Sequence, residues 1–220
     1  MEQNRGFDRE STLEKERYFS EGYFEKYQLF ALSEQIHLLY NVIKDESTPK
    51  ILEIGKGNGF VSDFFKKAGY DFSTFDINAN LEPDYVGNIL ELSSIVTNKP
   101  STILCCEVLE HISFETFEQS IEQLSLSTQQ RVILTLPIHK KFFGVNLQFR
   151  LPKMKPFSIP LFIKTSWTKI LPEEHFWEIG YNSETSKKSI DTILNRYFKI
   201  EDEDCFHTSP FHYYYVLTKR

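Results

Sequence analysis

A glycine-rich turn directly after a short apolar run constrains the fold of this chain more than any other feature. Residues 50–59 read Lys-Ile-Leu-Glu-Ile-Gly-Lys-Gly-Asn-Gly. Ile51, Leu52 and Ile54 predict a short buried strand, and apolar residues at helical spacing begin at Phe60. Because glycine lacks a Cβ atom, glycines at every second position let the backbone adopt positive φ and approach a ligand closely. The stretch therefore predicts a strand, a ligand-binding turn and a helix.

The spacing within the turn separates it from two nucleotide-binding motifs. A dinucleotide fingerprint, G-x-G-x-x-G, requires glycine where this chain has Phe60, and the phosphate loop G-x-x-x-x-G-K-[ST] is absent. Glu53 lies two residues before the first glycine, and in this form the turn resembles motif I of the class I S-adenosylmethionine (SAM)-dependent methyltransferases. The resemblance implies SAM as cofactor, which carries an ammonium and a sulfonium but no phosphate. Residues implied to bind it here are Glu53, Gly55, Lys56, Gly57 and Gly59. A purely structural strand-to-helix turn is the alternative.

Two further strand ends extend this expected cofactor site. Residues 71–76 alternate polar and apolar side chains and end in Asp76, 23 residues after Glu53. A carboxylate at such a strand end can accept hydrogen bonds from ribose hydroxyls. A short strand is expected at 84–87, and the family often has an acid where Asn88 stands, which contacts the adenine amino group. The side-chain carbonyl of asparagine can accept the same hydrogen bond. The cofactor residues expected here are Asp76, Ile77, Asn88 and Ile89.

A second motif follows the strand expected at 101–106. Residues 107–112 read Glu-Val-Leu-Glu-His-Ile, which resembles the small-molecule branch that includes the ubiquinone-biosynthesis O-methyltransferases. The resemblance implies that Cys106 and Glu107 contact the cofactor. Glu107, Glu110 and His111 also offer oxygen and imidazole ligands of the kind that divalent cations bind. Some relatives are associated with such an ion, but we expect these acids to orient the cofactor and cap the helix, and we predict no metal.

The alternation of strands and helical stretches predicts a single α/β domain over residues 1–220. Strands separated by helices form parallel pairs through right-handed crossovers. We therefore predict a Rossmann-like, doubly wound, seven-stranded and mostly parallel sheet with an antiparallel C-terminal hairpin at 198–201 and 212–218. An N-terminal helical segment is expected at 1–45, whose first 20 residues form a frayed tail or a loosely docked helix. Ligands of such sheets gather at the carboxyl ends of the strands.

Residues 138–172 form a basic, aromatic segment that is too long for a simple connection. Between 139 and 169 there are seven Lys and Arg residues and no Asp or Glu; because the whole chain carries −6, the remainder carries −13. Three prolines discourage a long helix. We interpret the segment as a substrate-side insertion or lid, with three open alternatives: a solvated lid, a surface for an anionic acceptor, or a membrane-interface patch over 139–169. The acidic remainder argues against nucleic acid.

Three histidines are candidate catalytic groups. Methyl transfer is an in-line displacement that depends on positioning, and a hydroxyl acceptor benefits from a general base. Our order of candidates is His175, His139 and His111. Each has a structural alternative: His175 packs beside its aromatic neighbours, His139 anchors the insertion, and His111 closes the turn after its strand.

These observations together predict a SAM-dependent methyltransferase, acting on oxygen of a small-molecule, carbohydrate or lipid-linked acceptor. A non-catalytic cofactor-binding module and an RNA or protein methyltransferase are the alternatives, and Phe60 disfavours an NAD-dependent oxidoreductase. The three cysteines, Cys105, Cys106 and Cys205, give no disulfide framework, and the N-terminus has no apolar signal sequence. A cytoplasmic location is therefore expected, whereas the oligomeric state is left open.

Overall fold

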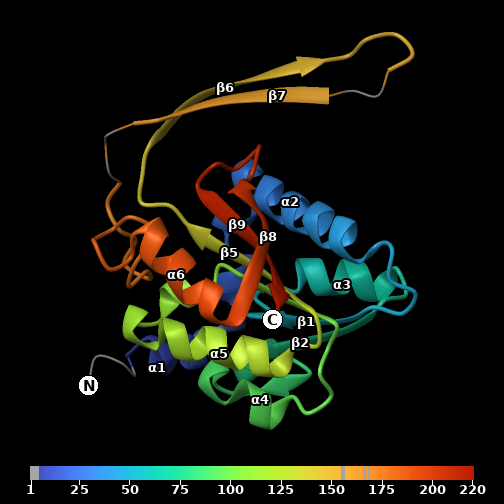
Figure 1. Ribbon diagram of the computed structural model, residues 1–220, viewed down its shortest axis with the longest axis vertical. Helices are drawn as coiled ribbons and strands as arrows, with labels where there is room; N and C mark the ends of the chain where they lie inside the picture. Colours follow the sequence, from blue (N-terminus) through green and yellow to red (C-terminus); the bar gives the residue numbers. More distant parts are fainter. Residues whose placement is uncertain (1–4, 155–156, 166, 168) are drawn as a thin grey trace.

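The computed structural model confirms the predicted sheet (Figure 1). It describes residues 5–154, 157–165, 167 and 169–220. Within these residues a seven-stranded sheet has the order β3-β2-β1-β4-β5-β9-β8, in which β9 runs antiparallel to both β5 and β8 and the other pairs are parallel. The strands are β1 Lys50–Ile54, β2 Asp71–Asp76, β3 Tyr85–Val86, β4 Thr102–Cys106, β5 Arg131–Pro137, β8 Phe198–Cys205 and β9 His212–Lys219.

Helices cover both faces of this sheet, because alternate residues of each central strand point to opposite faces. In β1, Ile51 belongs to a core with α2 (Lys26–Ile43) and α3 (Phe60–Lys67). Leu52 and Ile54 belong to the larger core on the other face. That second face is covered by α4 Leu92–Ile95, α5 Phe117–Ser127 and α6 Lys187–Tyr197. The short helices of the connections are η3 Ala79–Leu81, η4 Ile89–Glu91, η5 Leu109–His111 and η6 Phe114–Thr116.

The N-terminal segment docks on the sheet rather than fraying. Its elements are α1 Arg5–Thr12, η1 Lys15–Phe19 and η2 Glu21–Phe24; residues 1–4 of the predicted tail lie outside the described residues. The side-chain amide of Asn78 donates a hydrogen bond of 2.7 Å to the Leu13 carbonyl. Gly6 packs so closely on η5 that a Cβ atom there would lie 2.3 Å from the His111 carbonyl oxygen. Residues 5–24 of the N-terminal segment are therefore packed against the rest of the domain.

The basic segment forms a separate antiparallel ribbon of β6 (Phe142–Phe149) and β7 (Phe157–Lys164). The ribbon projects from the seven-stranded sheet at one end of the long axis (Figure 1). No described residue of β6 or β7 lines the cavity presented below, whereas Lys169, Pro172 and His175 of the stretch after β7 do. The role of residues 138–172 as an insertion or lid stays a prediction. Lys155 and Pro156 lie outside the described residues. Among the residues described, no helix combines the length and apolar character that crossing a membrane requires.

Candidate functional site

A cavity of about 960 Å³ opens at the carboxyl ends of β1, β2 and β4. The structure brings most of the predicted site residues together around it. These are Glu53, Gly55, Lys56, Gly57, Asp76, Ile77, Ile89, Cys106, Glu107, His111 and His175. Gly59, Asn88 and His139 do not line the cavity. Two separately predicted motifs, the glycine turn and residues 107–112, thus meet at one site.

The glycine turn has the backbone conformation that its sequence predicts. Gly55, Gly57 and Gly59 have φ angles of +79°, +52° and +74°, which residues with a Cβ atom rarely adopt. A Cβ atom at Gly55 would lie 2.5 Å from Cγ2 of Val108, so this position also requires glycine for space. Gly59 precedes α3 as its left-handed N-cap instead of facing the cavity.

Lys56 holds the turn in place instead of facing a ligand with a free ammonium group. Its Nζ donates hydrogen bonds to the carbonyl oxygens of Leu81 (2.6 Å) and Glu82 (2.8 Å). These bonds tie the turn after β1 to the connection that follows β2. If Lys56 contributes to cofactor binding as predicted, it does so through its backbone and by holding the glycine turn in place, and not through a free ammonium group.

Two carboxyl groups from neighbouring strands face the cavity. Glu53 is buried, and its Oε2 has no hydrogen-bond partner among the described residues. Burial raises the pKa of Glu53 to about 8, against a hydrogen bond with Ser62, and the charge of Asp76 adds to the rise. Burial also raises the pKa of Asp76, although the backbone N–H of Asn78, 2.8 Å from Oδ1, acts in the other direction. An orphaned carboxyl oxygen of this kind fits a cationic ligand.

Asn88 has a local structural role that differs from the predicted adenine contact. Its side-chain oxygen accepts a hydrogen bond of 2.9 Å from the Leu90 N–H and so caps η4. The neighbouring residues Gly87 and Ile89 line the cavity in its place. Asparagine is a favoured helix cap, so the sequence also carried a signal for this local role, and the predicted adenine contact of Asn88 stays a prediction.

Glu107 leaves β4 with an unusual backbone conformation. Its φ is +54°, a region that costs a non-glycine residue about 1–3 kcal/mol. Its Oε1 accepts a 2.7 Å hydrogen bond from the Thr135 hydroxyl, and its Oε2 lies 3.4 Å from Nε2 of His212. The carboxylate is therefore held between two partners at the cavity wall. Beside it, burial raises the pKa of the Cys106 thiol well above its usual value, which opposes nucleophilic chemistry there.

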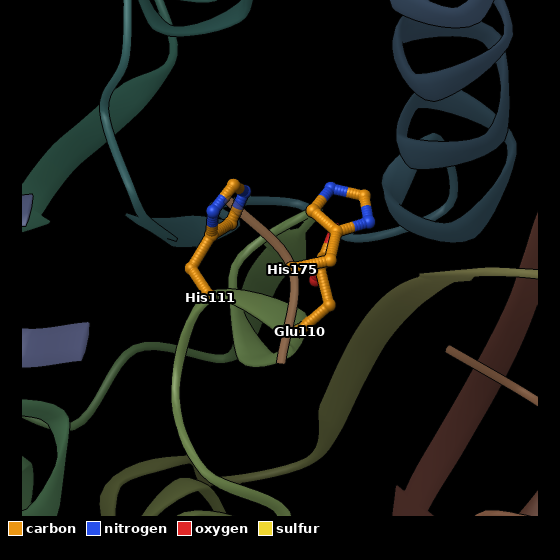
Figure 2. Close-up of side chains that lie close together, drawn as sticks. All are labelled: Glu110, His111 and His175. Carbon is orange, nitrogen blue, oxygen red and sulfur yellow. The ribbon is translucent and has the colours of Figure 1, made fainter. Parts of the chain in front are cut away.

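Glu110, His111 and His175 form what we call the histidine–carboxylate cluster (Figure 2). One potential ligand atom from each residue lies within 4.8 Å of those of the other two. The imidazole rings of the two histidines are 5.0 Å apart between centroids and nearly perpendicular, at 88°. They come from two distant segments, η5 and the stretch before α6, which meet through the 2.8 Å hydrogen bond from the Phe176 N–H to the Glu110 carbonyl oxygen.

The charges of this cluster are strongly affected by its surroundings. Glu110 is fully buried, and neither of its carboxyl oxygens has a hydrogen-bond partner among the described residues. Burial and the neighbouring charge of Glu107 raise its pKa well above the usual value. Burial and the nearby His175 lower the pKa of His111 to about 4, so this imidazole is neutral at pH 7. A buried carboxyl group thus faces neutral imidazole.

This donor set fits a divalent cation. Carboxylate oxygen and neutral imidazole are the ligands that Mg²⁺, Mn²⁺ and Zn²⁺ bind in proteins. The two orphaned oxygens of Glu110 are the observation that supports the fit, because an unpaired buried carboxyl group is otherwise unfavourable. The set differs from the one considered from sequence, since His175 takes part while Glu107 is engaged by Thr135. Our expectation of no metal stays a prediction, and the cluster gives a reason to test it.

Glu178 connects the cluster to the base of the ribbon. It is fully buried and lies 2.9 Å from Nδ1 of His175, 3.0 Å from Nδ1 of His139 and 2.8 Å from Nζ of Lys169. Burial alone would raise the pKa of Glu178, but the hydrogen bonds from His175 and Lys169 outweigh it and lower the pKa. His139 is buried against Tyr181, with 5.1 Å between ring centroids. It anchors this region and does not line the cavity, and its catalytic role stays a prediction.

Sequence reasoning missed the contribution of the N-terminal segment. Arg17, Tyr18 and Tyr23 line the cavity, and a Cβ atom at Gly57 would lie 3.8 Å from the Tyr18 ring. The Tyr18 hydroxyl lies 3.4 Å from Oε2 of Glu10, whose Oε1 is 3.6 Å from Nδ1 of His111. The recurring aromatic residues in this charged segment could have indicated that it packs on the rest of the protein, because large aromatic side chains are usually buried and are uncommon in frayed tails.

Comparison with solved structures shows that this chain has the fold of the class I SAM-dependent methyltransferases. It is similar to magnesium protoporphyrin IX methyltransferase from Synechocystis PCC 6803 with bound SAM, with a TM-score of 0.60, 15% identity and coverage of 99% of this chain and 93% of that one. It is also similar to the glycopeptide N-methyltransferase MtfA with bound S-adenosylhomocysteine (SAH), with a TM-score of 0.55, 9% identity and coverage of 85% and 89%.

A further likeness is to the PH0226 protein from Pyrococcus horikoshii OT3, with a TM-score of 0.57, 13% identity and coverage of 93% of this chain and 99% of that one. Neither a known protein-family profile nor a curated protein sequence matches the chain. At these low identities the likenesses establish the fold, whereas the reaction has to be argued from the site.

Proposed function

We propose that this protein is a SAM-dependent methyltransferase that methylates oxygen on a small-molecule, carbohydrate or lipid-linked acceptor. One observation carries the proposal: the cavity joins a glycine turn, two strand-end carboxyl groups and the histidine–carboxylate cluster. SAM would supply a methyl group on a positively charged sulfur. Structures of the same fold solved with SAM and SAH support this cofactor.

The residues around the glycine turn would hold the cofactor. The orphaned Oε2 of Glu53 suits a ligand cation, and Asp76 at the end of β2 suits ribose hydroxyls. Gly87 and Ile89 leave room and an apolar contact for a purine ring. Tyr18, which lies over Gly57, would exclude water from the bound molecule.

The histidine–carboxylate cluster would activate the acceptor hydroxyl. Because Nδ1 of His175 is engaged by Glu178, Nε2 is the ring nitrogen left to accept the hydroxyl proton. A divalent cation held by Glu110, His111 and His175 would instead lower the pKa of the hydroxyl by its charge. Both arrangements use the same residues, and metal removal distinguishes them.

The remaining cavity wall favours a ring-containing acceptor. Tyr23, Tyr27 and Phe211 offer aromatic faces on which a sugar or another ring can pack. Arg17 and Lys169 also line the cavity, but each is paired with a carboxylate: Arg17 lies 3.9 Å from Glu174 and Lys169 lies 2.8 Å from Glu178. Free sugars and lipid-linked sugars present rings that suit the aromatic wall.

Isothermal titration calorimetry with SAH tests the cofactor, and transfer of a labelled methyl group from SAM tests the reaction. We expect SAH to bind, NADH not to bind, and the label to enter nucleotide-sugar or glycolipid fractions. His175→Ala should lower transfer at least ~100-fold with little change in SAH affinity, since a general base contributes about 10²–10⁴-fold. Asn41→Ala, an exposed position that does not line the cavity, is the control.

Each alternative has its own outcome in this experiment. SAH binding without transfer to any fraction would favour a non-catalytic module. Transfer into RNA or protein alone would replace the acceptor class, and NADH binding in place of SAH would refute the cofactor assignment.

A further inference from the structure

The ribbon of β6 and β7 separates its side chains into two unlike faces. Successive residues of a strand point to opposite faces, and residues directly opposite in an antiparallel pair share a face. The pairs Phe143–Ile163, Val145–Leu161, Leu147–Ile159 and Phe149–Phe157 therefore lie on one face, and all eight residues are large and apolar. The alternate positions include Gly144, Asn146 and Gln148. We call the first set the apolar ribbon face.

The apolar ribbon face is uncovered, although such side chains normally pack in a core. Its eight side chains are between 37% and 68% exposed. Together these fractions equal about four fully exposed large residues, or roughly 600 Å² of apolar surface, which is at the upper end of patches on monomeric proteins. The opposite face is partly satisfied, because Phe162 packs over Gly144 and Phe142 packs on Phe211. The apolar exposure is therefore concentrated on one side, although Phe162 on the other face is still 36% exposed.

Basic residues lie at both ends of the apolar ribbon face. Arg150 and Lys153 are exposed at the turn, and Lys140 and Lys141 precede β6 at the base. No Asp or Glu occurs between 139 and 172. Exposed Trp167 and Ile170 follow at the base as well. An apolar surface between two basic ends matches the layered chemistry of a membrane interface, where acyl chains lie beneath anionic headgroups.

We propose that the apolar ribbon face binds the interface of a membrane that contains anionic lipid. A second copy of the chain fits less well. Two ribbons packed face to face would bring basic ends against basic ends whichever way they run, because Arg150 and Lys153 mark one end and Lys140 and Lys141 the other. Anionic headgroups neutralise both ends at once. The proposal does not depend on the reaction proposed above.

Such binding would place the cavity close to the lipid surface. Lys141 and Trp167 are joined at the base of the ribbon by a backbone hydrogen bond of 3.0 Å, and Lys169 lines the cavity two residues further on. Figure 1 shows the ribbon projecting away from the seven-stranded sheet, and no described residue of β6 or β7 lines the cavity, so these strands can lie on a membrane without covering it. An acceptor within or tethered to that membrane would then be presented locally.

The test is co-sedimentation of the full chain with vesicles, read together with tryptophan fluorescence. Vesicles of phosphatidylcholine with roughly a third phosphatidylglycerol should bind the protein, and pure phosphatidylcholine should bind it at least ~10-fold less. Of the two tryptophans, Trp167 is exposed and Trp177 is buried, so a blue shift on vesicle addition reports the ribbon. High salt should weaken the binding.

Matched variants make the result specific to one face. The double substitution Leu147→Ser and Ile159→Ser, which changes one opposite pair, should lower vesicle partitioning at least ~10-fold. Asn146→Ser with Gln148→Ser, on the alternate positions of β6, should leave it unchanged. Arg150→Gln with Lys153→Gln gives a second test that leaves the apolar face intact. Circular dichroism melting confirms that each variant is folded.

Three results would each overturn the proposal. The first is equal sedimentation with and without anionic vesicles, and the second is equal partitioning of the two serine variants. The third is a concentration-dependent dimer in analytical ultracentrifugation without lipid that the Leu147→Ser and Ile159→Ser variant abolishes, since a second copy would then be the occupant.

Discussion

Binding of SAH should be coupled to loss of a proton from Glu53. Burial raises the pKa of this carboxyl group to about 8 in the free protein, from an ordinary value of 4.5. A ligand that places an ammonium group near the orphaned Oε2 stabilises the charged form and lowers the pKa again. At pH 6, binding must therefore first remove a proton that the free protein holds tightly.

The magnitude follows from the distance between the working pH and the raised pKa. If the bound pKa returns to its ordinary range, deprotonation at pH 6 costs about 2.7 kcal/mol, or roughly 100-fold in affinity. The cost falls to about 1.4 kcal/mol at pH 7 and disappears above pH 8. SAH affinity should thus rise about tenfold per pH unit between pH 6 and 8 and then level off.

Calorimetry in two buffers with different ionisation enthalpies measures this coupling directly. At pH 6.5 we expect the release of nearly one proton for each SAH bound by the wild type and none from Glu53→Gln. Asp76→Asn is a second comparison: it should weaken binding and keep a pH slope, but the slope should level off at a lower pH, because the charge of Asp76 helps to raise the pKa of Glu53. A wild-type affinity that stays level from pH 6 to 8, or a slope that persists in Glu53→Gln, would refute the argument.

The raised pKa of Glu53 also predicts how the stability of the free protein depends on pH. Its contribution lowers the stability as the pH rises, whereas a salt-bridged acid raises it. A carboxyl group with a raised folded-state pKa binds its proton more tightly in the folded chain. The raised pKa therefore lowers the free energy of unfolding by an amount that is zero below the unfolded pKa of 4.5, grows as the pH rises, and is complete above about pH 8. The full penalty is up to about 5 kcal/mol, so Glu53→Gln should be the more stable protein at pH 9 in thermal melting.

Three further perturbations test other parts of the site. Gly55→Ala combines left-handed backbone strain with a 2.5 Å contact to Val108, so it should lower the free energy of unfolding by about 2–4 kcal/mol in denaturant titration. Gly180→Ala is the control: its φ is also positive but no atom lies within 4 Å of the added Cβ, so it should lower the free energy of unfolding by only about 1 kcal/mol. If the cluster binds a cation, contrary to our expectation of no metal, Mn²⁺ or Zn²⁺ will raise the melting temperature of the wild type but not of Glu110→Gln, and an equal response in both would exclude the cluster as the site. Tyr18→Ala should speed SAH release, and an unchanged off-rate would show that the N-terminal segment is no lid.

The sheet and the cofactor end of the site were predictable because their signals are local. The glycine turn specifies its own backbone conformation, since positive φ at Gly55 and Gly57 can be inferred from residue type. Each strand end was marked by a polar residue after an apolar run. Parallel topology then brings such ends to one edge, which is why Glu53, Asp76 and Glu107 meet at the cavity.

The parts that sequence reasoning missed depend on contacts between distant segments. The docking of residues 5–24 rests on single partners such as Leu13 with Asn78, which no periodicity reveals. Asn88 was assigned by its place in a motif, but a local cap takes its side-chain oxygen. The ribbon was missed for another reason: its alternation of apolar and polar residues is that of a strand, yet it lies among prolines and has no core to pack on.

Glu178 shows how one residue that neither motif marks can set the chemistry of the cluster. Its ion pair with Lys169 neutralises the buried negative charge. The hydrogen bond to Glu178 fixes Nδ1 as the protonated atom, and Nε2 is then left with a lone pair. That state is required whether the imidazole accepts the hydroxyl proton or binds a cation. His139 lies in the connection before β6, and Lys169 lies in the connection after β7. Both contact Glu178, so the residues at the base of the ribbon also hold the group that fixes the tautomer of His175.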